Sequence, residues 1–190
     1  IPDEHHAEML LAIGWNGMVS HQMPRAPLTI KEFSQNPEKL LVVIDPRRSE
    51  TASIANLHIA LRPGSDALLA KAMIALILAE GWEDKEYLAR NTSDYELIKG
   101  WFQNFDIKQA LAVCQVEYQQ IKELCKELSR RRWCMHTDLG VIMNRHSTLA
   151  SYLYLLLSAV CGRLCVPGGD VIPGSVVPLG SHSDERNDRT

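Results

Sequence analysis

Three short segments carry the side chains best suited to chemistry, and each one follows a run of apolar residues. They are residues 14–17 (GWNG), 45–49 (DPRRS) and 62–66 (RPGSD). A carboxylate accepts hydrogen bonds from ribose hydroxyls or from the N–H groups of a base, and arginine side chains bind phosphate. Together these residue types are typical of a site for a nucleotide that carries phosphates. A charged turn in solvent remains the alternative for any one segment taken alone.

The second segment has the clearest structural setting. Residues 40–44 (LLVVI) predict a buried strand of a parallel sheet. Pro46 cannot continue the strand, because proline has no N–H group and a fixed φ. Asp45 therefore lies at the carboxyl end of the strand, where open α/β sheets bind nucleotides, with Arg47 and Arg48 directly after it.

The third segment precedes a helix that we expect from Ala67 to Glu80, ended by Gly81. The N–H groups at the start of such a helix favour an anion. Ser65 and Asp66 are also common N-cap residues, so a capping role stays open for both, and Gly64 leaves room for either role.

The elements around these segments predict an α/β fold. Strands expected at residues 9–13, 41–45, 57–61 and 133–136 alternate with helices, and a helical elaboration covers residues 66–131. Thr29, with Glu32 three residues later, predicts the start of a short helix. The fold class is a doubly wound, mainly parallel Rossmann-like sheet, in which the parallel strands end at one edge, so that the three segments meet there.

A nicotinamide dinucleotide is a weaker alternative ligand. After the first expected strand the sequence is GWNGMVS rather than the G-x-G-x-x-G fingerprint, and Trp15 is bulky at a pyrophosphate.

Composition excludes several other classes of function. The net charge of −3 and the pI near 6.2 give no reason to expect nucleic acid or an anionic membrane as a partner. The longest charge-free apolar run, residues 149–161, is shorter than the about 20 residues that span a bilayer. The five cysteines include no C-x-x-C pair, so we assign no metal ligands. The polar, acidic start is not typical of a signal peptide, which favours the cytoplasm, with the periplasm as the alternative.

The order and spacing of the motifs resemble those of the molybdopterin oxidoreductases of the dimethyl-sulfoxide-reductase type, a family that includes formate dehydrogenases. The resemblance covers about residues 8–170. It rests on Gly14 with Asn16 and on residues 43–52 (VIDPRRSETA), 54–58 (IANLH), 62–68 (RPGSDAL) and 167–169 (PGG).

The resemblance implies that residues 1–170 are similar to the Rossmann-like third domain of that family, with residues 171–190 as a loop or tail. In the family this domain holds one of two molybdopterin guanine dinucleotides, between which the molybdenum or tungsten atom lies. The cofactor-binding residues that the resemblance implies are Gly14 and Asn16 on the pterin or pyrophosphate path, Asp45, Arg47 and Ser49 at the nucleotide, Gly64, Ser65 and Asp66 at the guanine, and Gly140 where the chain turns back towards the cofactor.

The sequence also departs from the family pattern. It lacks the amino-terminal cysteine motif for an iron–sulfur cluster, the residue that ligates the metal, and the carboxyl-terminal barrel domain. The segment after residues 167–169 lacks the Arg-Gly-Gln run of the formate dehydrogenases, which leaves the substrate open. We therefore expect a cofactor-binding fragment of an oxidoreductase, inactive alone and without catalytic residues of its own, whose partners are the remaining domains of the same polypeptide and electron-transfer subunits. A stand-alone nucleotide-binding or regulatory domain is the alternative.

Overall fold

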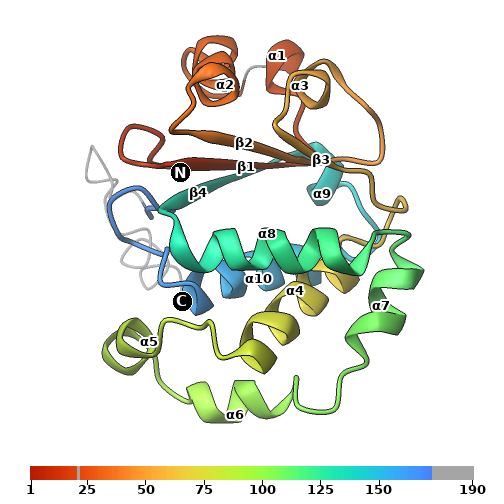
Figure 1. Cartoon of the computed structure of the whole chain (residues 1–190), viewed down its shortest axis with the longest axis vertical. Helices are drawn as coiled ribbons and strands as arrows, with labels where there is room; N and C mark the ends of the chain where they lie inside the picture. The colour runs from red at the N-terminus through yellow and green to blue at the C-terminus, as the bar shows by residue number, and fades with distance from the viewer. Residues whose placement is uncertain (21, 173–190) are drawn as a thin grey trace, which may run out of the picture.

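A parallel sheet forms the centre of the computed structural model, which describes residues 1–20 and 22–172 (Figure 1). Its strands lie in the order β3-β2-β1-β4. They are β1 (Met9–Ile13), β2 (Leu40–Ile44), β3 (Leu57–Ile59) and β4 (Trp133–Thr137). The strand order and parallel pairing confirm the α/β class expected from the sequence.

Alternate residues of the central strands enter two separate cores. Leu11 of β1 and Val42 of β2 belong to a large core on one face of the sheet. Leu10 and Val43 belong to a smaller core on the other face. Every residue of β1 is buried, as expected of a parallel strand covered on both faces.

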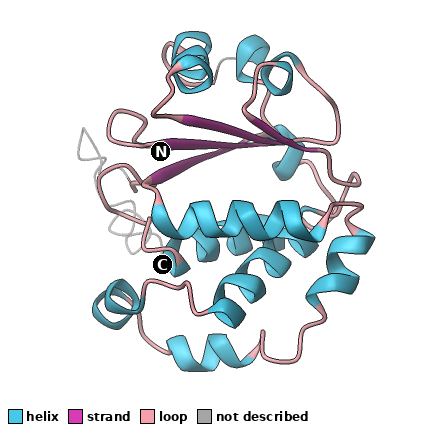
Figure 2. Ribbon diagram, in the orientation of Figure 1, coloured by secondary structure: helices cyan, strands magenta, loops and turns pink. Residues whose placement is uncertain are grey.

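Helices cover both faces, as Figure 2 shows. The smaller core lies under α1 (Gly17–Ser20), α2 (Ala26–Gln35) and α3 (Glu50–Ser53). The opposite face carries α4 (Asp66–Glu80), α5 (Lys85–Asn91), α6 (Tyr95–Gly100), α7 (Ile107–Val113), α8 (Tyr118–Arg130) and α10 (Ser147–Val160), and α9 (Leu139–Ile142) follows β4 at the carboxyl edge of the sheet. The expected helical elaboration therefore lies on one face of the sheet.

Two expected boundaries differ from the structure by more than one residue. The helix predicted to start at Thr29 starts at Ala26, after Arg25 in a left-handed conformation and with proline in the first turn. Strand β3 ends at Ile59 rather than at residue 61, because its partner β2 ends at Ile44, which pairs with Ile59.

Asp170 fixes the end of the described chain against the sheet. Its Oδ1 accepts from the Met135 N–H of β4 at 2.8 Å, and its Oδ2 accepts from the Ser158 hydroxyl of α10 at 2.9 Å. Most of the expected tail, residues 173–190, lies outside the described residues. No helix among the described residues is long and apolar enough to cross a membrane.

Candidate functional site

The loops after β1 and β4 meet at the point where the chain changes direction in the sheet. β1 pairs with β2 on one side and with β4 on the other. Such a switch point opens a crevice at the carboxyl ends of the strands, where α/β proteins bind ligands. Gly140 N donates to Gly14 O at 3.1 Å, and a Cβ added at Gly140 would lie 2.6 Å from Gly14 Cα. The two glycines thus let the loops touch.

Asn16 joins the loop after β1 to the first turn of α3. Its Nδ2 donates to Glu50 Oε2 at 2.6 Å. Its Oδ1 accepts from the Thr51 N–H at 3.2 Å and from the Thr51 hydroxyl at 2.9 Å. Both ends of the amide are therefore engaged within the protein, so that Asn16 positions the loop after β2.

The segment after β2 forms a turn held by its own aspartate. Asp45 Oδ1 accepts from the Arg47 N–H at 2.8 Å, and the Asp45 carbonyl lies 2.9 Å from His58 Nε2. The Arg47 and Arg48 side chains are exposed, and the Arg47 guanidinium lies 3.7 Å from Glu50. Ser49 is buried and caps α3, because its Oγ accepts from the Ala52 N–H. This turn presents cationic side chains to solvent beside a half-buried carboxylate.

The segment after β3 shows that neither Ser65 nor Asp66 caps α4 with its side chain. The Ser65 hydroxyl donates to the Arg62 carbonyl at 2.6 Å, within the turn. Asp66 is the first residue of α4, and its Oδ2 accepts from Asn144 Nδ2 at 2.7 Å. Ser65 therefore occupies the N-cap position without a side-chain capping bond, and the buried Asp66 carboxylate binds the segment between α9 and α10. Gly64 is exposed with a positive φ, and a Cβ there would meet no atom within 4 Å.

The two aspartates follow the neighbouring strands β2 and β3 at the carboxyl edge of the sheet. Burial raises the pKa of Asp66, the Asn144 hydrogen bond opposes this shift, and the negative charge of Asp45 adds to it. Two carboxylates from neighbouring loops therefore share the carboxyl edge of the sheet. Nearby, the His136 ring lies 3.9 Å from the Trp15 ring between centroids, and burial lowers the pKa of His136.

Of the nine residues assigned from the sequence, seven lie in loops that follow the strands at this edge, whereas Asp66 is the first residue of α4 and Gly140 lies in α9. Sequence reasoning assigned no role to Glu50 and Thr51, although both stand inside the quoted motif. Their role follows only from the contact with Asn16. No sequence pattern pointed to Asn144, because 78 positions of the sequence separate it from its partner Asp66.

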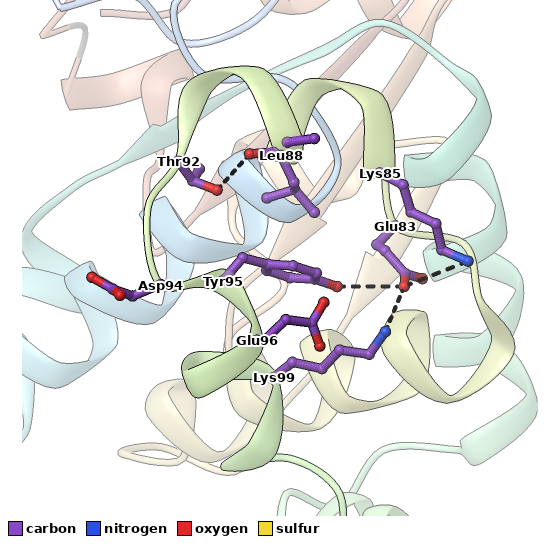
Figure 3. Close-up of a pocket in the computed structure, with 9 residues that line it drawn as sticks. Glu83, Lys85, Leu88, Thr92, Asp94, Tyr95, Glu96 and Lys99 are labelled. Carbon is purple, nitrogen blue, oxygen red and sulfur yellow. Dashed lines mark hydrogen bonds and ion pairs between the residues drawn. The ribbon is translucent and has the colours of Figure 1, made fainter.

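A cavity of about 430 Å³ lies between α5 and α6 (Figure 3). Its most buried charge is Glu83, whose side chain is 1% exposed and whose Oε1 lies 3.0 Å from Lys99 Nζ and 3.4 Å from the Tyr95 hydroxyl. Burial and the Glu83 charge raise the pKa of Tyr95 to about 12. This network ties the segment between α4 and α5 to α6, on the side of α4 away from the sheet and far from the strand ends (Figure 1). We therefore read it as structural.

Comparison with known proteins gives a consistent set of relatives. No protein-family model matches the chain. It is 28% identical over 180 residues to the F420-dependent formate dehydrogenase subunit alpha of Methanocaldococcus jannaschii, covering 91% of this chain and 25% of that protein. It is 27% identical over 184 residues to the periplasmic nitrate reductase of Desulfovibrio desulfuricans, covering 87% of this chain and 23% of that protein. The chain thus spans about a quarter of these curated relatives.

A solved structure has the same fold. Acetylene hydratase from Pelobacter acetylenicus superposes with a TM-score of 0.73 at 23% identity, covering 85% of this chain and 22% of that one. The curated relatives are molybdopterin oxidoreductases, which confirms the family resemblance expected from the motifs.

Proposed function

We propose that this chain is the guanine-dinucleotide-binding domain of a molybdenum- or tungsten-dependent oxidoreductase, about a quarter of a longer polypeptide that acts on a small substrate. Sequence similarity along nearly the whole chain to formate dehydrogenase and nitrate reductase subunits supports this proposal. In this proposal, residues 1–170 form the domain that binds the dinucleotide.

The observation that carries the proposal is the set of contacts between the segments that follow the four strands at the carboxyl edge of the sheet: Gly14 with Gly140, Asn16 with Thr51, and Asp66 with Asn144. Asp45 and Asp66 supply acceptors there, and a carboxylate pairs well with the adjacent N–H donors of a guanine edge. The exposed Arg47 and Arg48 suit a diphosphate. Gly64 leaves open space in front of its backbone. The donor and acceptor set therefore fits a guanine nucleotide.

Asp66 and Asn144 have linked roles in this proposal. The Asn144 amide occupies one oxygen of the buried Asp66 carboxylate. Guanine would take its place, so that base binding exchanges one hydrogen bond for charge-assisted bonds from the base. Asn16 and Ser49, engaged inside the protein, hold the loops in position instead of reaching the ligand directly.

The chemistry itself lies outside this chain. The bound cofactor supplies two-electron redox chemistry at its metal, and this domain supplies binding and orientation. The second dinucleotide, the metal ligand, an iron–sulfur cluster and the contacts with electron-transfer subunits belong to the rest of the enzyme. We expect the 190-residue chain alone to be inactive and to contain no molybdenum or tungsten by elemental analysis.

Calorimetric titration with guanosine diphosphate and adenosine diphosphate tests the base recognition. We expect a clear preference for the guanine nucleotide, and we expect Asp66→Asn to weaken its binding about ten- to a hundredfold by replacing an acceptor with a donor. Asp106→Asn is the matched control, because Asp106 caps α7 and asparagine caps equally well. Equal affinities for both nucleotides, or unchanged binding by Asp66→Asn, would contradict guanine recognition.

A further inference from the structure

Helix α10 is apolar on both of its sides, although one side is exposed. It contains no charged residue from Ser147 to Val160. Leu153 and Leu157 belong to the large core, whereas Leu149, Tyr152 and Leu155 are exposed at spacings that place them on one face. A helix that is apolar all round is normally buried all round.

Helix α8 shows how this chain builds a helix that faces water. Its buried stripe of Ile121, Leu124 and Leu128 alternates with charged and amide residues on the exposed side, such as Glu123 and Lys126. The two helices therefore differ in the residues on their exposed sides: α8 has charged and amide side chains there, whereas α10 has large apolar side chains of the kind found in a protein interior.

A groove of about 370 Å³ runs beside this face. Its lining includes Gly64 and Lys71 from the α4 side, Trp101 after α6, and Tyr152 of α10. Trp101 is 60% exposed. Within residues 1–20 and 22–172, no acidic residue lines the groove, and the Lys71 ammonium lies 4.7 Å from the centre of the Phe105 ring. An occupant that brings a carboxylate to Lys71 would complement this charge.

Exposed apolar side chains also lie on and directly after α9, a helix that contacts α10. Leu139, Ile142 and Met143 are exposed, Met143 to 79%. The combined surface, which we call the α9–α10 face, thus runs from the carboxyl edge of the sheet along α10. A cluster of exposed large apolar side chains is typical of a protein–protein contact.

We propose that the α9–α10 face is the docking surface for another segment of the same longer polypeptide, one that inserts apolar side chains into the groove and an acidic side chain beside Lys71. This rests on the proposed function, in which the chain is about a quarter of its enzyme. Docking there would also contact the segment after α9, which carries Asn144, the residue that guanine would displace from Asp66. The contact therefore links domain assembly to the candidate nucleotide site.

Hydroxyl-radical labelling of the natural, full-length protein tests the docking surface. Labelling of Met143, Trp101 and Tyr152 is compared in the native and urea-unfolded protein. We expect labelling of all three to be at least about tenfold slower in the native protein, as for side chains in the core of an interface. Native labelling within about twofold of the unfolded rate, as their exposure in this chain alone implies, would overturn the docking.

A pair of variants separates docking from folding. Tyr152→Lys is expected to leave the melting temperature of the 190-residue chain unchanged, because Tyr152 is exposed, and to lower that of the full-length protein. Gln119→Lys, at an exposed position of α8, is the matched control and should change neither. An unchanged melting temperature of the full-length Tyr152→Lys protein would overturn the proposal. So would protection of the groove from labelling that arises only when the 190-residue chain dimerises.

The intact mass of the natural protein shows whether a negative result contradicts the proposed function or only the docking. A mass near the 21.4 kDa of this chain would overturn the proposed function and the docking together. A much larger mass with an unprotected groove would overturn the docking alone.

Discussion

At the scale of single residues, Asn16 shows what a motif can and cannot reveal. The G-x-N and S-E-T motifs are separated in sequence, and the Asn16 amide joins them through Glu50 and Thr51. Residue types alone indicated a polar group near a ligand. The hydrogen-bond partners depend on the pairing of β1 with β2, which brings the two loops together, so a positioning role could not be predicted from the spacing.

Asp170 is a buried acid whose ionisation should affect stability in the acidic pH range. Burial raises its pKa from 3.8 to about 6, against the hydrogen bonds from Met135 and Ser158. An acid with a raised pKa in the folded protein favours folding while it is protonated, so its contribution is lost as the pH rises from about 4 to above 6. The loss is on the order of 3 kcal/mol.

Asp170→Asn should remove this pH dependence. The asparagine oxygen can accept from the Met135 N–H, and its amide can donate to the Ser158 hydroxyl, so the contacts survive without the charge. We expect urea denaturation to show the variant gaining stability over the wild type between pH 4 and pH 7. The exposed Glu38→Gln serves as the control and should follow the wild-type curve. Parallel curves for Asp170→Asn and wild type would contradict the raised pKa.

At the scale of elements, the crevice depends on the approach of the loop after β1 to α9. We expect Gly140→Ala to cost about 1–3 kcal/mol of unfolding free energy, because its Cβ would lie 2.6 Å from Gly14 Cα and 2.7 Å from Gly14 O, both backbone atoms. Gly100→Ala is the contrast: a Cβ there meets nothing within 4 Å, and alanine favours the helix over glycine. Denaturation of both variants at one pH checks the difference, and an equal loss in both would mean that the close approach carries no energetic weight.

The sequence predicts elements better where local signals are strong. The apolar runs of β1 and β2 and the left-handed Gly81 after α4 mark boundaries that the structure confirms. The start of α2 could not be placed, because Pro27 in the first turn competes with the capping pattern at Thr29. Likewise, the partner of Asp66 depends on how α4 packs against α10, which is a property of the tertiary structure.

At the scale of the whole molecule, a single sheet lies between the two cores and contributes residues to both. Trp15 is fully buried in the smaller core, and Trp133 is fully buried in the larger one. Successive residues of β1 point alternately into the two cores, so neither core can lose its strand residues while the other keeps them. The two layers should therefore unfold together.

Fluorine NMR of the chain labelled with 5-fluorotryptophan tests this coupling without any substitution. The four tryptophans give separate signals, of which Trp15 and Trp133 report the two cores. We expect both native signals to disappear at the same urea concentration, because removing β1 from one core exposes the other. Trp101, already exposed, should shift least on unfolding. Loss of the Trp15 signal at a lower urea concentration than Trp133 would mean that the helices α1 to α3 detach first, and that the candidate site opens before the rest of the domain unfolds.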